Sequence, residues 1–196
     1  AFGIGTECLN SLYPKTVSSA APIRYTIVAN SMFRGALDEF VEWKRRKGFL
    51  VDAVYTDEPQ VGNTTTSIAA WLKAQYDNAN DTMPAPTYVL LVGDVAQIPA
   101  FVGETDEEHV SDLYYATWSS GDHVPDCYYG RFSASSLSQL QPQIDKTLMY
   151  EQYTFSDPTF LDRAVLVAGV DGGTDGDFGY THADPTMDYA ATNYIN

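Results

Sequence analysis

The feature that most constrains the fold is an alternation of short apolar runs with segments of helical periodicity. The runs 25–29, 50–55 and 88–92 consist mostly of β-branched, aliphatic and aromatic residues, as buried strands do. Between them, residues 30–47 and 66–76 place apolar side chains three or four positions apart, which is typical of amphipathic helices. This order predicts a mainly parallel sheet with helices on both faces, a three-layer α/β/α architecture.

The second half of the chain continues the alternation. It adds a short strand at 127–131, a helix at 135–150 and another strand at 164–170. A last helix starts near residue 184, with Asp184 as its cap and Pro185 in its first turn. Pro158 marks a boundary, so residues 1–157 are predicted to form one α/β subdomain and 158–196 to begin a second. One strand and one helix cannot bury a core, so this second subdomain is incomplete within the chain.

The charge of the chain excludes one large class of function. Its 196 residues include 11 Lys and Arg against 26 Asp and Glu, for a net charge of −15. Nucleic-acid binding needs clustered basic residues, so that class is excluded. No apolar stretch approaches the ~20 residues of a membrane span. The acidic excess suits metal ions or substrates that carry Lys or Arg, and equally an ordinary solvated surface.

Several carboxylates lie where parallel sheets form their sites, beyond the carboxyl ends of strands. Asp171 follows the strand 164–170, where it would either orient a catalytic histidine or cap the bend that follows. Asp184 would either bind a guanidinium group or serve as an ordinary helix cap. The loop residues Asp94, Asp122 and Asp126 are oxygen donors suited to calcium, or simply solvated acids.

A thiol nucleophile within the chain is a further hypothesis. In this hypothesis Cys127 and one of the three histidines form a Cys–His nucleophile pair. Cys127, however, is flanked by Pro125 and two tyrosines, a context typical of strand packing rather than of a reactive turn.

An ordered set of short segments over about residues 22–196 also resembles a known family. The segments are Trp43-Lys44, Gly48-Phe49, Tyr55-Thr56-Asp57-Glu58, Val61-Gly62, Leu91-Val92-Gly93-Asp94, Asp112-Leu113-Tyr114-Tyr115, Arg131-Phe132-Ser133-Ala134-Ser135-Ser136, Ile144-Asp145-Lys146 and Leu148-Met149-Tyr150-Glu151. Together they resemble the gingipains, secreted bacterial cysteine endopeptidases with a caspase-like fold. The resemblance is closest overall to the lysine-specific gingipain.

The resemblance implies a division of the catalytic machinery. The family's catalytic Cys and His lie beyond Asn196, so this chain resembles the N-terminal portion, or a processed light chain, of a catalytic domain whose second part carries both. Asp171 matches the carboxylate that supports the catalytic His. Asp184 falls where arginine-specific members carry the Asp at the base of the S1 pocket, whereas the lysine-specific member has an amide there.

The resemblance also implies ions, substrates and a location. Asp94 and Asp126 match a structural calcium site, and Asp122 a second ion site, with no organic cofactor. The substrates would be proteins or peptides with Arg or Lys at P1, and the location secreted or at the cell surface, after zymogen processing.

The sequence therefore predicts part of a cysteine endopeptidase that works by Cys–His acyl transfer. The alternative is a non-catalytic α/β module that binds calcium or another protein and is only vestigially similar to a protease. A third hypothesis is an independent hydrolase that uses Cys127.

Overall fold

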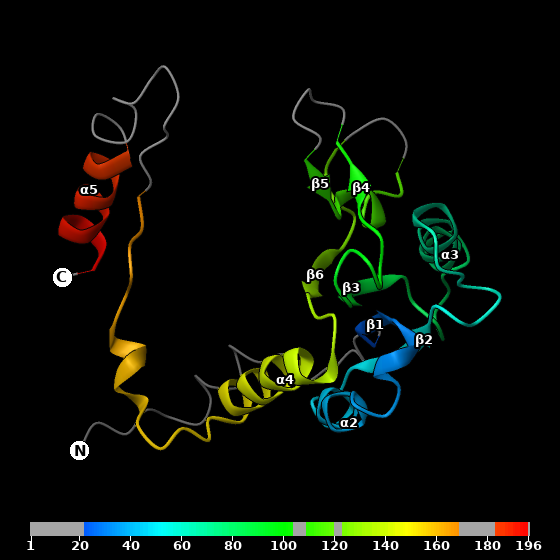
Figure 1. Cartoon of the computed structure of the whole chain (residues 1–196), viewed down its shortest axis with the longest axis horizontal. Coiled ribbons are helices and arrows are strands. Elements are labelled where there is room, and N and C mark those ends of the chain that lie inside the picture. The colour runs from blue at the N-terminus through cyan, green and yellow to red at the C-terminus, as the bar shows by residue number, and fades with distance from the viewer. Residues whose placement is uncertain (1–21, 104–108, 120–122, 169–182, 196) are drawn as a thin grey trace, which may run out of the picture. The chain divides into compact units, whose positions relative to one another are not determined.

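The chain divides into two compact units (Figure 1). The computed structural model describes residues 22–103, 109–119, 123–168 and 183–195. Unit 1 is Ala1–Glu151 and unit 2 is Gln152–Asn196, a division that lies slightly before the predicted boundary at 157/158.

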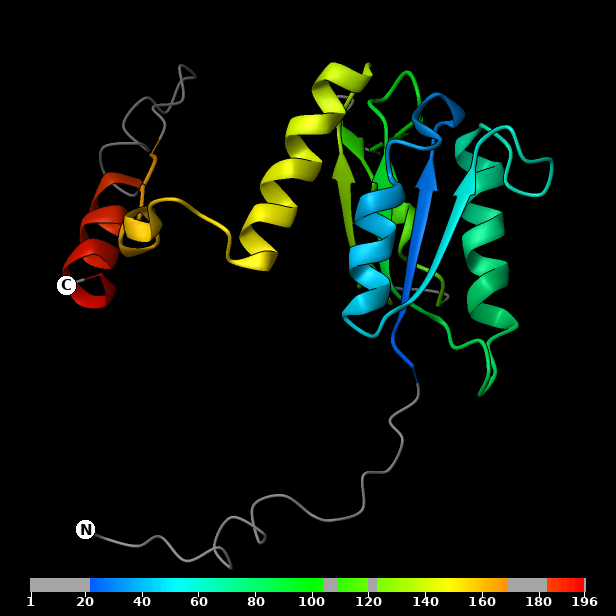
Figure 2. The same ribbon diagram turned by 90° about the horizontal axis from the view of Figure 1, so that it is seen from below.

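Unit 1 is built on a four-stranded sheet in which every pair of neighbouring strands is parallel (Figure 2). The strand order is β2-β1-β3-β6, which confirms the predicted parallel arrangement. The strands are β1 (Arg24–Ala29), β2 (Leu50–Tyr55), β3 (Pro86–Val92) and β6 (Tyr128–Phe132). The register aligns Ile27 of β1 with Ala53 of β2 and Leu90 of β3, so all the carboxyl ends meet at one edge.

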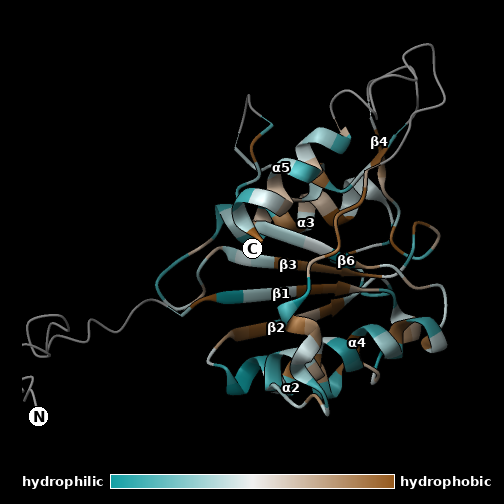
Figure 3. Ribbon diagram, turned by 90° about the vertical axis from the view of Figure 1, so that its left-hand side faces the viewer, coloured by the Kyte–Doolittle hydropathy of each residue, from teal (hydrophilic) through white to brown (hydrophobic). Residues whose placement is uncertain are grey.

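Helices cover both faces of this sheet (Figure 3). The helices α2 (Asp38–Arg46) and α4 (Leu137–Gln152) cover one face, and α3 (Thr65–Asp77) covers the other. Successive strand residues point to opposite faces. Ile27 and Ala29 therefore pack in the core under α2 and α4, whereas Val28 packs in the core under α3.

The first two helices begin at positions different from those predicted. Residues 31–33 form a separate 3₁₀ turn capped by Asn30, and α2 begins only at Asp38. Gly35 lies between them with a φ of +86°, a left-handed conformation that a continuous helix cannot contain. The cap of α3 is Thr64, whose side chain accepts from the backbone N–H of Ser67 in a reciprocal capping box.

Short regular elements follow β3. The strands β4 (Phe101–Val102) and β5 (Val110–Ser111) pair in an antiparallel two-stranded sheet. A 3₁₀ turn follows at Leu113–Tyr115. Two-residue strands carry too little periodicity to be recognised in a sequence.

Unit 2 corrects two predictions about its elements. It contains a 3₁₀ turn at Pro158–Asp162 and the helix α5 (Asp184–Tyr194). Residues 164–168 form no strand, and Val165 and Val167 are 86% and 78% exposed, because no partner strand is present among the described residues of unit 2. Asp184 is the first residue of α5 rather than its cap, a position that Ala183 occupies.

Among the described residues, no helix combines the length and apolar character needed to cross a bilayer.

Ile144 in α4 tests the packing of unit 1. Its side chain is fully buried in the core under α2 and α4, so Ile144→Ala should lower the free energy of unfolding by about 2–5 kcal/mol in urea titrations. The exposed neighbour Lys146→Ala should change it by less than about 0.5 kcal/mol. Equal effects of the two changes would contradict this packing.

Candidate functional site

The carboxyl edge of the sheet in unit 1 presents polar side chains from three strands. Asn30 follows β1 directly, Asp94 comes two residues after the end of β3, and Ser133 follows β6 directly. Asp94 Oδ1 accepts from the Val95 N–H at 2.9 Å and from Ser133 Oγ at 3.0 Å. These hydrogen bonds lower the pKa of Asp94, so its exposed carboxylate is ionised at neutral pH.

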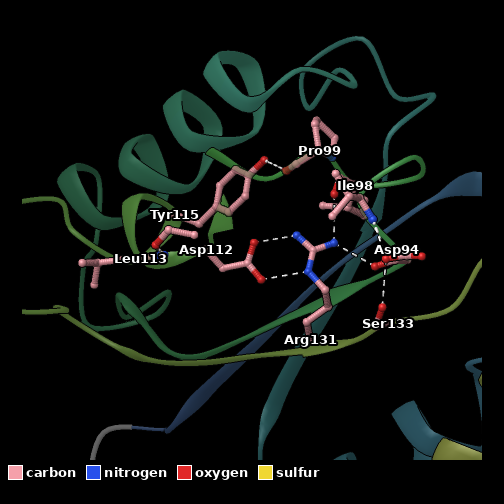
Figure 4. A network of polar contacts seen from close by, with 11 residues as sticks. Asp94, Ile98, Pro99, Asp112, Leu113, Tyr115, Arg131 and Ser133 are labelled. Atoms are coloured by element: carbon pink, nitrogen blue, oxygen red, sulfur yellow. Dashed lines mark hydrogen bonds and ion pairs between the residues drawn. The ribbon is translucent and has the colours of Figure 1, made fainter. Parts of the chain in front are cut away.

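A largely buried arginine shapes the loop after β3 (Figure 4). Arg131 of β6 donates from Nη1 to the carbonyls of Gly93 and Ile98, at 2.8 and 2.9 Å. Its Nε and Nη2 donate to the two carboxylate oxygens of Asp112, at 2.8 and 2.6 Å. The side chains of Arg131 and Asp112 are only 12% and 20% exposed, so each neutralises the other's charge away from bulk water.

The same loop requires glycine at its first position. Gly93 has a φ of +143°, and a Cβ added there would lie 2.7 Å from Gln97 Cβ. The Tyr115 hydroxyl donates to the Pro99 carbonyl and holds the far end of the loop. The turn between β3 and the β4–β5 hairpin is thus fixed at both ends.

A hollow of about 270 Å³ lies beside this loop. Asp94 and Ser133 form part of its polar lining, and Val95, Ala100 and Val110 its apolar lining. Asp112 and Arg131 also line it, so the hollow combines two carboxylates and one guanidinium with apolar walls.

The structure does not bring the predicted calcium ligands together. Asp94 follows β3 at the carboxyl edge, whereas Asp126 precedes the parallel strand β6 at the opposite edge. The five residues of β6 span roughly 13 Å, but oxygens on one calcium ion lie within about 5 Å of each other. The two carboxylates thus lie apart in this structure, and a calcium ion that they share stays a prediction.

Asp126 instead organises its own loop. Its carboxylate accepts from the hydroxyl and N–H of Ser119 and from the N–H of Trp118, and these bonds lower its pKa. Asp122 lies outside the described residues. Within the described ranges, no group of three or more His, Cys, Asp or Glu side chains is placed to hold a metal ion. A calcium ion at any one of these residues stays a prediction.

Cys127 does not have the environment of a nucleophile. Its side chain is buried in the core under α3. Burial, and to a lesser extent the carboxylate of Asp126, raise the pKa of its thiol to about 12. The reactive form of cysteine is the thiolate, so the hypothesis of an independent hydrolase that uses Cys127 has no support in the structure.

The two carboxylates predicted for catalysis and specificity belong to unit 2. Asp171 lies outside the described residues, so its role stays a prediction. Asp184 borders a hollow of about 250 Å³ together with Leu166, Ala168, Met187 and Asp188. Because Asp184 is not the helix cap, its carboxylate is available to line this hollow.

Sequence reasoning missed the pairing of Arg131 with Asp112. Both residues stand in segments that resemble the gingipains, yet no role was assigned to either. A signal was present, because Arg131 stands in a predicted strand of a parallel sheet, where an arginine needs a partner.

The comparison with known proteins now decides the family. Residues 18–195 match the family model described as peptidase family C25. The chain belongs to peptidase family C25. This confirms the family predicted from the ordered short segments.

Similar proteins include both kinds of gingipain. Lys-gingipain W83 of Porphyromonas gingivalis is 38% identical over 175 residues, which cover 89% of this chain and 10% of that protein. Gingipain R2 of the same species is 30% identical over 156 residues, which cover 80% of this chain and 20% of that protein. The chain therefore spans only a small part of these relatives.

Solved structures confirm the fold of this C25 chain. A protease structure matches 89% of the chain and 37% of its own length, with a TM-score of 0.78 and 38% identity. The crystal structure of the Arg-specific cysteine proteinase gingipain R matches 89% of the chain and 38% of its own length, with a TM-score of 0.70 and 27% identity.

The reactivity of Cys127 tests its placement in the core. In a Cys8→Ser variant, iodoacetamide at pH 8 should alkylate Cys127 far more slowly in the native protein than in urea, because burial raises its pKa to about 12 and blocks access. The rate is measured by intact mass over time. Equal rates with and without urea would contradict the buried thiol.

The Arg131–Asp112 pair gives a second test of the site. Asp112→Ala removes the carboxylate partner of a largely buried guanidinium, which keeps its two backbone carbonyl acceptors, and should lower the free energy of unfolding by about 2 kcal/mol. The matched control is Asp57→Ala, which removes the exposed partner of Arg34 and should cost less than about 1 kcal/mol. If Asp112→Ala costs no more than the control, Arg131 does not organise this loop.

Proposed function

We propose that this chain is the N-terminal part of the catalytic domain of a cysteine endopeptidase that cleaves after Arg or Lys. The observation that carries the proposal is the C25 match over residues 18–195, together with 38% identity to Lys-gingipain and 30% identity to Gingipain R2. The buried Cys127 is a poor nucleophile, which supports a nucleophile elsewhere in the complete protein.

The proposed chemistry is acyl transfer to a thiol. A thiolate attacks the carbonyl carbon after the basic residue, and an imidazole protonates the departing amine. Both groups belong to the part of the protein beyond residue 196. This chain contributes Asp171, whose carboxylate accepts from the imidazole N–H, fixes its tautomer and stabilises the imidazolium that forms.

Asp184 is the proposed determinant of specificity. A carboxylate at the base of a pocket binds a guanidinium through two parallel hydrogen bonds, or an ammonium as a point charge. Its position in a mainly polar hollow that also includes the carboxylate of Asp188 supports this role, because an anionic pocket suits a cationic side chain. The overall identity favours the lysine-specific branch, whereas an Asp at this position favours arginine.

The remaining parts of the proposal come from the family. One solved relative is a complex of the pro- and mature domains of a P. gingivalis gingipain, which supports activation from a zymogen. We extend this to secretion or display at the cell surface, to a second chain that carries the Cys and His, and to a structural calcium ion.

The proposal is tested on the complete protein. Asp171→Ala should lower kcat/KM by about 10³-fold or more on Arg and Lys peptides alike, because the imidazole loses its partner. Asp184→Asn should lower kcat/KM for Arg peptides by about 30-fold or more while it shifts the Arg/Lys ratio, because the cation loses its countercharge. Asp57→Asn, outside both roles, should leave both values unchanged.

Two results would contradict the proposal. Unchanged kinetics in Asp171→Ala and Asp184→Asn would remove both assigned roles. A complete protein with no peptidase activity would favour the non-catalytic binding module instead.

A further inference from the structure

The strand β6 ends the sheet on one side, and its first half is uncovered (Figure 2). Among the described residues, β6 pairs with β3 alone. Tyr128, Tyr129 and Gly130 are all exposed, and the two tyrosines have 70% and 40% of their surface accessible. The strand at the other end of the sheet, β2, contains no exposed residue. The two edges therefore differ, and that of β6 is the open one.

The backbone of β6 directs hydrogen-bonding groups away from the sheet. The Phe132 carbonyl accepts from the Gly93 N–H, so Phe132 faces β3. Backbone groups alternate in direction along a strand, so those of Gly130 also face β3, whereas those of Tyr129 and Arg131 point outward. Open edges are usually protected by charge, proline or a bulge. The exposed part of β6 contains neither charge nor proline, and its register with β3 is regular, so this edge is able to accept a further strand.

A hollow lies at the same edge. A Cβ added to Gly130 would have no atom within 4 Å, so the space beside this glycine is empty. Gly130 lines a hollow of about 200 Å³ together with four tyrosines and two aliphatic residues of β1, β3 and β6. None of the described side chains that line it is charged. The hollow therefore suits an uncharged, apolar group.

Stacked tyrosines specify the kind of group. The rings of Tyr25 and Tyr88 lie 5.6 Å apart at 21°, and those of Tyr88 and Tyr128 lie 5.4 Å apart at 23°. The three residues occupy matching register positions on β1, β3 and β6, so the stack runs across the sheet and ends at Tyr128. An aromatic side chain on a neighbouring strand covers an edge glycine and stabilises the pairing. Both Tyr128 and Gly130 thus call for an aromatic residue on a strand beside β6.

Charge and chain length decide between the sources of such a strand. A second copy of this chain would bring two molecules of charge −15 together, and like charges oppose that association. The solved protease of similar fold is much longer, because this chain covers only 37% of it. A strand from the remainder of the complete protein is tethered, so its effective concentration at the edge is high.

We propose that the edge of β6 receives an additional strand from the part of the complete protein outside residues 1–196, and that an aromatic side chain of this strand fills the hollow beside Gly130 and packs on Tyr128. The inference rests on the proposed function, which makes this chain part of a longer catalytic domain. It adds the surface of unit 1 on which the remainder of that domain assembles.

The test is photo-crosslinking in the complete protein. Tyr128→p-benzoylphenylalanine places a photoreactive group at the end of the stack, and peptide mass mapping locates the residue that it captures. The expected product is a crosslink within one polypeptide, to a segment outside residues 1–196 that contains an aromatic residue. Its yield should exceed about fivefold that of the same probe at Glu42, an exposed position on α2 that sets the background.

A variant that fills the hollow gives an independent measurement. Gly130 is not among the glycines with a positive φ, so Gly130→Ile is compatible with the backbone. In the complete protein it should lower the midpoint of thermal unfolding by about 3 °C or more, because two side chains compete for one space. In the 196-residue chain, where the hollow is empty, it should not lower the midpoint, because isoleucine suits a strand better than glycine.

Three results would overturn the inference. A crosslink between two polypeptides would make β6 an interface between copies. A crosslink confined to residues 1–196, or no more frequent than at Glu42, would mean that no outside strand covers the edge. An equal fall of the unfolding midpoint in both proteins would mean that the outside segment does not fill the hollow.

Peptidase activity measured on the same samples separates this inference from the proposed function. An active peptidase without the predicted crosslink contradicts the inference alone. A complete protein that forms the crosslink but cleaves no peptide contradicts the proposed function alone.

Discussion

A parallel strand must be covered on both of its faces, and this constraint organises the whole of unit 1. The sheet β2-β1-β3-β6 sends alternate side chains into two separate cores, one under α2 and α4 and one under α3. Sheets of this kind place their binding sites beyond the carboxyl edge, and that edge presents Asn30, Asp94 and Ser133 here. In unit 2 the apolar side chains of Val165 and Val167 lack such cover and are exposed. This exposure supports the proposal that further sequence of the protease completes the second unit.

The charge balance at the carboxyl edge depends on one buried arginine. Arg131 neutralises Asp112 and holds the carbonyls of Gly93 and Ile98, which fixes the loop that carries Asp94. The net charge of −15 favours encounter with basic polypeptides, which agrees with the function proposed for this C25 chain.

Much of the fold could be predicted from the sequence, because the signals were long and regular. The apolar runs at 25–29, 50–55 and 88–92 lie within β1, β2 and β3, since β-branched and aliphatic runs suit a buried parallel strand. The helix predicted from residue 30 failed at Gly35, where a local left-handed conformation overrides the periodicity. The strand predicted at 164–170 failed in its described part, because a strand requires a partner that the sequence of the run does not specify.

The site was less predictable, because it depends on which edge of the sheet each residue occupies. Asp94 and Asp126 have the same chemistry, but one follows its strand and the other precedes a parallel strand, so they lie at opposite edges. The parallel direction predicted for both strands already implied this separation, but the calcium prediction considered only the oxygen donors. Asp171 and Asp122 lie outside the described residues and remain predictions.

The most direct measurement is to map a covalent affinity label on the complete protein. A chloromethyl ketone with Lys or Arg at P1 alkylates the nucleophile of an active protease, and peptide mass mapping locates the labelled residue. The account predicts one labelled Cys in sequence beyond residue 196, with Cys127 unmodified because it is buried and its pKa is raised to about 12. A label on Cys127 or on Cys8 would contradict the account and would place the nucleophile within this chain.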